Sequence, residues 1–273
     1  MKSAAVLRGR RRARRFFFMK AGGTEAATPH ELASSLGMEA ATPQEQWRFY
    51  VARKQCVSAT TEMLQSYLQW RAETLPLPPS APRIGNGLPD WMCFHGHARD
   101  RTPICHVNGA MYDRNVATPE QYADAAAQLF DDSLPRESLT KVTVLLDVRG
   151  DAGWANSPVH HYFPLIRTMA KLLGDNFPER LNRLIVYPVP SFGMAIWRTV
   201  KPWIDDATAQ KICLLPGSAK RGAPCPVELA EHVEYAQIRS DRQHRHKALL
   251  HARVMNRADS ENIPPHSQQT LME

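Results

Sequence analysis

The run VTVLLDV at residues 142–148 consists almost entirely of β-branched and aliphatic side chains, so it predicts a β-strand. Further short β-rich runs lie before and after it, separated by segments with helical periodicity. The predicted strands are residues 104–107, 142–148, 184–187 and 212–215, and the predicted helices are residues 119–130, 158–173 and 192–201. This alternation is typical of an α/β domain whose mostly parallel sheet is covered by helices.

Two helices and a linker precede this domain. Thr42 can cap a helix and Pro43 suits its first turn, which predicts a helix over residues 44–54 and places the first ordered stretch after this pair. Ser58 can cap a second helix, which ends before Pro76. The density of Pro and Gly in residues 76–90 is incompatible with a helix or a central strand, so we predict a linker there.

The predicted organisation has five parts. After Pro226, residues 227–257 are helix-prone and increasingly basic, and the remaining residues are predicted to be disordered. The parts are a basic disordered arm (1–42), a small all-helical domain (43–75), a Pro/Gly-rich linker (76–90), the α/β domain (91–235), and a basic helix with a disordered tail (236–273).

Basic residues concentrate at the two ends of the chain. The 273 residues carry 34 Lys and Arg against 27 Asp and Glu, a formal net charge of +7. Residues 1–20 hold eight of the basic side chains and no acid, whereas residues 21–238 hold more acidic than basic side chains. The pI of about 9.3 therefore describes the ends of the chain and gives no support to a nucleic-acid-binding core.

The cysteine content and the hydropathy of the sequence limit the cellular locations that we expect for the protein. The five cysteines form no C-x-x-C pair, which indicates reduced intracellular thiols, and no run approaches the roughly 18 apolar residues of a membrane span. The apolar run at residues 16–19 is too short for a secretory signal. We predict a cytoplasmic protein with a solvated basic arm; the alternative is that the Arg-rich start is a mitochondrial transit peptide.

Common enzyme signatures are missing from the sequence. It contains no G-x-S-x-G, H-E-x-x-H, G-x-G-x-x-G or G-x-x-x-x-G-K-[ST], and residues 217–222 order Gly and Lys wrongly for a phosphate-binding loop. The spacing of Cys93, His95, His97, Cys105 and His106 matches no closed tetrahedral zinc motif. We predict no enzyme activity, no cofactor and no metal.

Three segments in order resemble a known family. They are VLLDVRG at residues 144–150, FPERL at residues 177–181, and WRTVKPWID at residues 197–205 followed by TAQKI at residues 208–212. These resemble the CRAL-TRIO family of lipid-binding proteins, in particular the secretory phosphatidylinositol transfer proteins. Residues 47–54 and 63–71 resemble the small helical domain that precedes the lipid domain in that family. The resemblance implies a CRAL-TRIO-type lipid-binding domain.

A candidate anion site follows from two of these segments. Thr208 and Lys211 are three residues apart, so on one helical turn they offer a hydroxyl and an ammonium group to the same phosphate. The resemblance implies that Arg53, Thr208 and Lys211 bind a phosphoinositide headgroup. It also implies an ion pair between Lys54 and Glu179 that links the helical domain to the turn beneath a gate. Without the resemblance, ordinary surface charges are the simpler interpretation.

The segment 192–204 is the candidate gate. Phe192, Ile196, Val200 and Trp203 share one helical face, and Trp197 and Ile204 extend it, so such a helix is expected to be covered almost all round. A fixed core helix is one interpretation. The resemblance implies instead a gate that covers the acyl chains and opens at the bilayer, with Pro202 interrupting the helix.

Val142 and Val144 complete the predicted acyl-chain pocket. They stand where phosphatidylinositol/phosphatidylcholine exchangers carry small hydroxyl residues, which speaks against phosphatidylcholine as a second ligand.

The sequence thus predicts non-enzymatic binding and intermembrane transfer or presentation of phosphatidylinositol. The predicted partners are a membrane surface, contacted transiently, and membrane lipid kinases that use the lipid; no nucleic acid is expected. The alternatives are a carrier of another hydrophobic ligand, such as a sterol or a tocopherol-like compound, and a protein-binding adaptor or GTPase-regulator domain on the same fold. A lipid phosphatase is disfavoured by the missing nucleophile motif.

Overall fold

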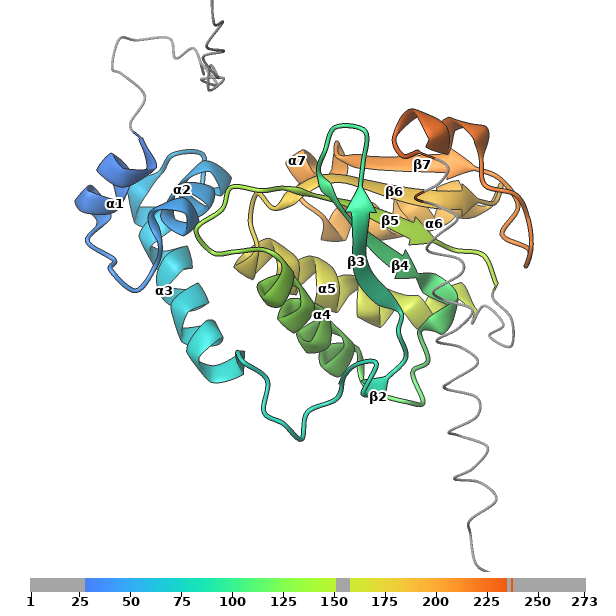
Figure 1. The fold of residues 1–273 in the computed structure, drawn as a ribbon, viewed down its shortest axis with the longest axis horizontal. Coiled ribbons are helices and arrows are strands. Elements are labelled where there is room, and N and C mark those ends of the chain that lie inside the picture. Colours follow the sequence, from blue (N-terminus) through green and yellow to red (C-terminus); the bar gives the residue numbers. More distant parts are fainter. Residues whose placement is uncertain (1–27, 151–157, 235–236, 238–273) are drawn as a thin grey trace, which may run out of the picture.

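A five-stranded sheet forms the centre of the computed structural model, which describes residues 28–150, 158–234 and 237 (Figure 1). The strands are β3 (Met92–His97), β4 (Pro103–Asn108), β5 (Val142–Asp147), β6 (Leu181–Val189) and β7 (Ile212–Pro216), and they neighbour one another in this order. β3 is antiparallel to β4, whereas β4 to β7 are parallel. The predicted α/β fold with a mostly parallel sheet is confirmed.

Helices pack on one face of this sheet. α4 (Pro119–Ser133) and α5 (Phe163–Asn176) contribute Tyr122, Phe130 and Leu165 to a core that also contains Cys105 and Val142. Successive residues of a strand point to opposite faces, so Leu145 of β5 belongs instead to the core on the other face. There Leu229 of the 3₁₀-helix η4 (Val227–Glu231) packs against the sheet.

Five short helical elements lie in the connections between the strands and the longer helices. These are η1 (Gly109–Met111), η2 (Val159–Tyr162), α6 (Gly193–Val200), η3 (Lys201–Trp203) and α7 (Asp206–Ala209). α6 and η3 both contact α5, so they close the side of the domain next to β6 and β7.

Three further helices form a unit beside the sheet. α1 (Pro29–Leu36), α2 (Pro43–Ala52) and α3 (Val57–Thr74) lie together in Figure 1, and Phe49, Met63, Leu64 and Tyr67 form their core. Thr42 accepts a hydrogen bond from the Glu45 backbone while the Glu45 carboxylate accepts one from the Thr42 backbone, so α2 begins with a capping box.

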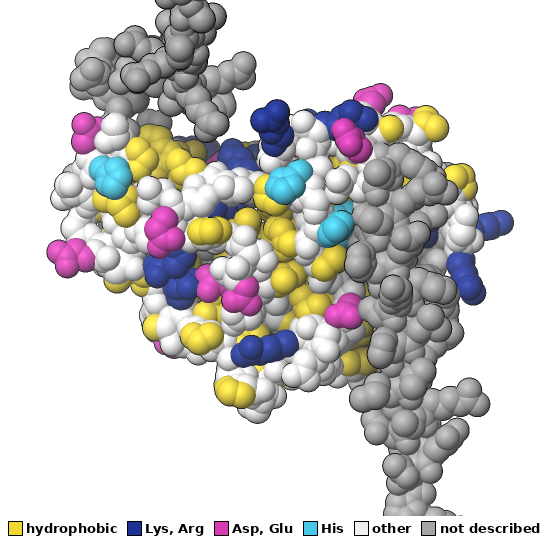
Figure 2. All heavy atoms as spheres, viewed as in Figure 1, with side chains coloured by type: hydrophobic (Ala, Val, Ile, Leu, Met, Phe, Trp, Pro, Cys, Tyr) yellow, Lys and Arg dark blue, Asp and Glu magenta, His cyan; other side chains and the backbone are white. Residues whose placement is uncertain are grey.

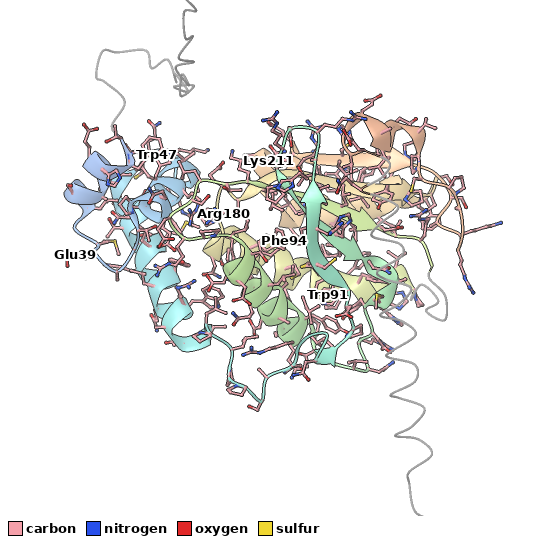
Figure 3. The ribbon with its side chains drawn as sticks, in the orientation of Figure 1. Glu39, Trp47, Trp91, Phe94, Arg180 and Lys211 are labelled. Carbon is pink, nitrogen blue, oxygen red and sulfur yellow. The ribbon has the colours of Figure 1, made fainter. Side chains whose placement is uncertain are left out.

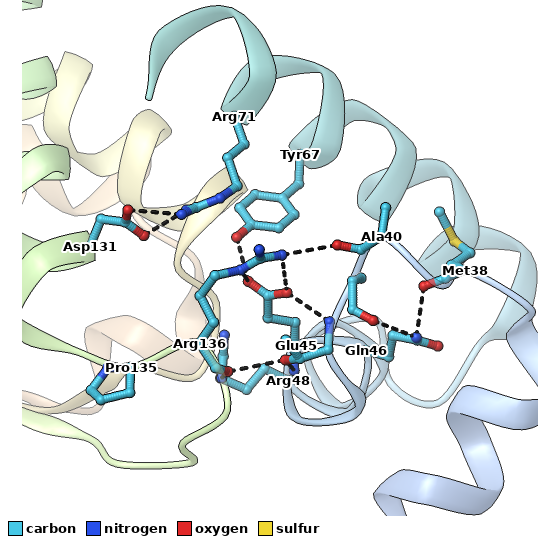
Figure 4. A network of polar contacts seen from close by, with 12 residues as sticks. Met38, Ala40, Glu45, Gln46, Arg48, Tyr67, Arg71, Asp131, Pro135 and Arg136 are labelled. Carbon is cyan, nitrogen blue, oxygen red and sulfur yellow. Dashed lines mark hydrogen bonds and ion pairs between the residues drawn. The ribbon is translucent and has the colours of Figure 1, made fainter. Parts of the chain in front are cut away.

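A polar network joins this helical unit to the α/β domain (Figure 4). Both terminal nitrogens of Arg71 on α3 donate hydrogen bonds to the carboxylate of Asp131 on α4, at 2.6 and 2.8 Å. Arg48 of α2 donates to the carbonyl oxygens of Arg136 and Ser138 in the loop after α4. Since these contacts fix α2 and α3 to α4 and its following loop, the unit has a defined position beside the sheet.

Several elements differ from the sequence-based expectation. The first described helix is α1, which lies before Thr42, because Thr28 and Glu31 form a capping box that the sequence analysis overlooked. The edge strand β3 was not predicted. The Pro/Gly-rich segment contains two two-residue strands, β1 (Arg83–Ile84) and β2 (Gly87–Leu88), which pair with each other apart from the central sheet.

Two more expectations concern helices. The predicted helix 158–173 begins as η2 and becomes α-helical only at Phe163. After Pro226 the chain forms the short 3₁₀-helix η4 rather than the start of a long helix. The prediction of a disordered arm over residues 1–42 is wrong for residues 29–36, which form α1, and residues 1–27 of that arm lie outside the described residues. Of the predicted basic helix and tail (236–273), all but residue 237 lie outside them as well.

The described surface gives two more findings. On the face shown in Figure 2, Lys and Arg side chains are interspersed with Asp and Glu side chains. Among the described helices, none is long and apolar enough to cross a bilayer.

Candidate functional site

A large cavity lies between the helix-covered face of the sheet and helices α5 and α6. Its volume is about 1420 Å³, which exceeds the roughly 300–1,000 Å³ typical of pockets for drug-sized ligands. Alternate residues of β5, β6 and β7 form its floor, among them Leu146, Val186 and Leu214. Ile166 and Met169 of α5 contribute to the wall. The cavity is therefore mainly apolar and suits a long hydrophobic ligand.

The structure brings together every residue that the sequence analysis assigned to the site. Val142 and Val144 line the cavity from β5, where they alternate with Thr143 on the other face of the sheet. The remaining residues come from the end of α2, the turn before β6, and the segment from α6 to β7. The lining includes Arg53, Lys54, Glu179, Phe192, Ile196, Trp197, Val200, Trp203, Ile204, Thr208 and Lys211.

The candidate gate is a broken helix with one exposed side. α6 ends at Val200, and the next three residues form η3, which contains Pro202, so the predicted interruption is confirmed. Trp203 packs edge-on against Phe163 of α5, with ring centroids 5.7 Å apart. Phe192 and Met194 are 57% and 50% exposed. The expectation that this helix is covered almost all round is therefore wrong, because its outer side faces solvent.

The polar end of the cavity is formed where α7 meets β7. The amide of Thr208 donates to the carboxylate of Asp205 at 2.9 Å, and the amide of Lys211 donates to the carbonyl oxygen of Thr208. Thr208 and Lys211, two of the three predicted headgroup ligands, are thus held within one turn. Burial raises the pKa of Asp205, but the hydrogen bonds from Thr208 and the charge of Lys211 outweigh it and keep the pKa below its ordinary value.

The turn before β6 places an acid among these basic groups. A carboxylate oxygen of Glu179 lies 3.6 Å from the ammonium of Lys211 and 3.4 Å from the ammonium of Lys141. In the part of the chain that the structure describes, Glu179 forms no ion pair with Lys54, the partner expected from the sequence. The loop before β5 and the end of α7 bring Lys141 and Lys211 closer to it.

Lys141 was missed by the sequence analysis, although a signal for it was present. It directly precedes β5, Lys211 directly precedes β7, and Glu179 precedes β6 by two residues. Because the amino ends of parallel strands meet at one edge of a sheet, residues in these three positions converge. Figure 3 shows Lys211 near Arg180 at this edge, whereas Trp91 lies toward the opposite one.

Arg180 fixes the same turn from the other side. It is buried, and its guanidinium donates to the carbonyl oxygens of Pro135, Ser138 and Thr140 at 2.6–3.0 Å. Burial and the neighbouring Arg180 together lower the pKa of the Arg48 guanidinium to about 10. Arg180 therefore ties the residue next to Glu179 to the loop that carries Lys141.

The cysteine and histidine residues near β3 have structural surroundings. Cys105 is buried in the core, where burial raises the pKa of its thiol, and His106 Nε2 lies 3.1 Å from the carbonyl oxygen of His95. Within the described residues, no group of three or more His, Cys, Asp or Glu side chains could hold a metal ion.

Comparison with known proteins gives one family match. The model of the CRAL/TRIO domain matches residues 90–241. The chain is similar to the phosphatidylinositol/phosphatidylcholine transfer protein SFH12 of Arabidopsis thaliana, with 27% identity over 187 residues that cover 62% of the chain and 34% of that protein. It is 23% identical to SFH9 of the same plant over 195 residues, which cover 62% and 32%. The chain spans about a third of the length of these relatives.

A solved structure has the same fold. The crystal structure of Sfh5 superposes with a TM-score of 0.53 at 16% sequence identity, over 65% of each chain. At this identity the likeness concerns the fold alone.

Proposed function

The chain belongs to the CRAL/TRIO domain family, and from this premise we propose that it binds phosphatidylinositol in the large cavity and transfers or presents it between membranes. The observation that carries the proposal is that one cavity combines an apolar floor with Arg53, Thr208 and Lys211 in its lining. This arrangement suits a ligand with two acyl chains and an anionic phosphodiester. The related transfer proteins of Arabidopsis support the same class of ligand.

Energetics require that the acyl chains be enclosed during transfer. Each buried methylene contributes about 0.8 kcal/mol, so neither chain of the lipid can be left in water. In this proposal α6 and η3 form the gate over the chains. The side chains of Phe192 and Met194 support contact of this segment with a bilayer, since they are apolar and at least half exposed.

The choice of phosphatidylinositol rests on the charged end of the cavity. A sterol or a tocopherol-like ligand is neutral and would offer no anionic group to Arg53 and Lys211. Although the names of the relatives include phosphatidylcholine, Val142 and Val144 offer no hydroxyl group from the cavity floor. We therefore propose phosphatidylinositol as the main ligand. The absence of catalysis and cofactors, delivery to lipid kinases and a cytoplasmic location with transient membrane contact stay predictions.

Transfer of labelled phosphatidylinositol between liposomes tests the proposal. We expect the native protein to transfer the lipid, and Arg53→Ala and Lys211→Ala to lose transfer while circular dichroism shows a retained fold. Lys220→Ala is the matched control, because Lys220 is an exposed lysine beyond the other end of β7. No transfer by the native protein, or equal transfer by all variants, would support the neutral-ligand or adaptor alternative instead.

A further inference from the structure

One carboxylate is shared by two ammonium groups at the charged end of the cavity. Glu179 lies 3.6 Å from Lys211 and 3.4 Å from Lys141, and its side chain is only 24% exposed. Lys211 is similarly covered at 25%, whereas Lys141 is 44% exposed. Lys141 is not among the described residues that line the cavity. The two lysines therefore have different access to a ligand but the same acidic partner.

This sharing creates a problem for an anionic headgroup. A phosphate that binds the ammonium of Lys211 competes with a carboxylate that already lies against it. If Glu179 lost its only partner, a mostly covered carboxylate would be left unpaired, which is unfavourable. Glu179 has a second partner, however, so its ion pair with Lys141 can persist while Lys211 turns to the phosphate.

The backbone around Lys141 is suited to such a role. The carbonyl oxygen of Thr140 accepts a hydrogen bond from Arg180 at 3.0 Å, and the carbonyl of Ser138 accepts from both Arg48 and Arg180. These contacts fix the loop directly before Lys141. Its side chain therefore extends from an anchored backbone position, independent of the ligand.

Resting on the function proposed above, we propose that Lys141 is a positioning residue of the headgroup site. Its ion pair with Glu179 persists when the phosphodiester of the lipid binds the ammonium group of Lys211. Lys141 then contributes to affinity for anionic lipids without touching the lipid itself. The carboxylate of Glu179 competes with the phosphate for Lys211 and so lowers the affinity for the lipid.

A double-mutant cycle tests this proposal. The purified full chain would be loaded from vesicles that contain phosphatidylinositol or diacylglycerol, which has the same acyl chains but no phosphate, and the bound lipid measured by mass spectrometry. The proteins are the native chain, Lys141→Gln, Glu179→Gln, the double variant, and Lys220→Gln as a control for the loss of one surface positive charge. Circular dichroism and thermal unfolding check that each variant is folded.

We expect Lys141→Gln to lower the affinity for phosphatidylinositol about three- to fivefold, the size of a partly exposed ion pair. Glu179→Gln is expected to raise it, and the double variant to match Glu179→Gln. Loading with diacylglycerol should be the same in all proteins, and Lys220→Gln should behave as native.

Three results would overturn the role of Lys141 alone, and a fourth would overturn the proposed function as well. An equal loss from Lys141→Gln in the native and Glu179→Gln backgrounds would make it a direct phosphate ligand, and an equal loss for diacylglycerol would make it a purely structural residue. If the native protein takes up diacylglycerol but no phosphatidylinositol, the proposed function fails, and this inference fails with it. Native uptake of phosphatidylinositol that Lys141→Gln leaves unchanged refutes the inference alone.

Discussion

The carboxylate of Glu45 on α2 and the guanidinium of Arg136 in the loop after α4 form two hydrogen bonds, each 2.7 Å long. The Glu45 side chain is 1% exposed, and it also accepts a hydrogen bond from the hydroxyl of Tyr67 on α3. One buried acid thus holds two helices of the helical unit to the α/β domain. The loop that it fixes is the loop that ends at Lys141 and so reaches the charged end of the cavity.

Replacing Glu45 with Ala should destabilise the protein. Loss of one partner of a fully buried ion pair costs about 3–5 kcal/mol, and because Arg136 is still 31% exposed we expect about 2 kcal/mol. Urea unfolding measures this change. Glu39→Ala is the control, since Glu39 is exposed and should change the free energy of unfolding little. Equal stability of the two variants would contradict the structural role of Glu45.

The contribution of Glu45 to stability should depend on pH. Burial raises the pKa of its carboxyl group, but the hydrogen bonds from Arg136 and Tyr67 outweigh burial, so the pKa in the folded protein is below its ordinary value. The ionised form is then favoured by folding, and the contribution is complete above the unfolded pKa of about 4.3. It is lost as the pH falls through the lower, folded pKa.

Unfolding of the native protein and Glu45→Gln as a function of pH measures this effect. The difference in unfolding free energy should be largest near neutral pH and shrink below about pH 4. A difference that stays constant down to the acid limit would show that the charge of Glu45 has no part in stability.

Val144→Trp should block lipid uptake without unfolding the protein. Val144 lies on β5 and faces the cavity, so an indole ring at this position has space to enter it. Excluding even two methylene groups of the ligand costs about 1.6 kcal/mol, so lipid affinity should fall more than about tenfold. Val144→Ala is the matched control and should retain uptake. Normal loading of Val144→Trp would place the acyl chains elsewhere.

Met194→Asp should slow exchange with membranes but leave the amount of bound lipid unchanged. Met194 is 50% exposed on α6 and is not among the described residues that line the cavity. Losing the burial of half a Met side chain at the bilayer costs about 1 kcal/mol, or about fivefold in transfer rate. Val227→Asp, an exposed change on η4, should transfer at the native rate. Equal rates in both variants would exclude α6 from membrane contact.

The fold was largely predictable because its strands have strong local signals. Residues 142–148 are aliphatic and β-branched, and Pro119 opens a helix whose amphipathic pattern is clear. β3 gave no such signal, because its residues Cys93 to His97 are mostly polar or small and include Gly96, which adopts a φ of 70°. Its strand conformation depends on pairing with β4, a contact that local sequence does not encode.

The sequence predicted residues that the structure places around one cavity, but it did not predict how the charged ones pair. Thr208 and Lys211 are close in sequence, so their proximity follows from one turn. Glu179 meets Lys141 and Lys211 only because three parallel strands start at the same edge of the sheet. The short side-chain distances at this edge depend on the loops, whose course sequence patterns leave open.

The cavity also bears on how long the protein survives in a cell. Its apolar floor on β5, β6 and β7 lacks the packing that other core residues have, and a bound lipid would supply it. Ligand that binds only the folded chain shifts the folding equilibrium toward that chain. On the function proposed above, the amount of intact protein should therefore follow the supply of its lipid, and the empty protein should be the form most open to proteolysis.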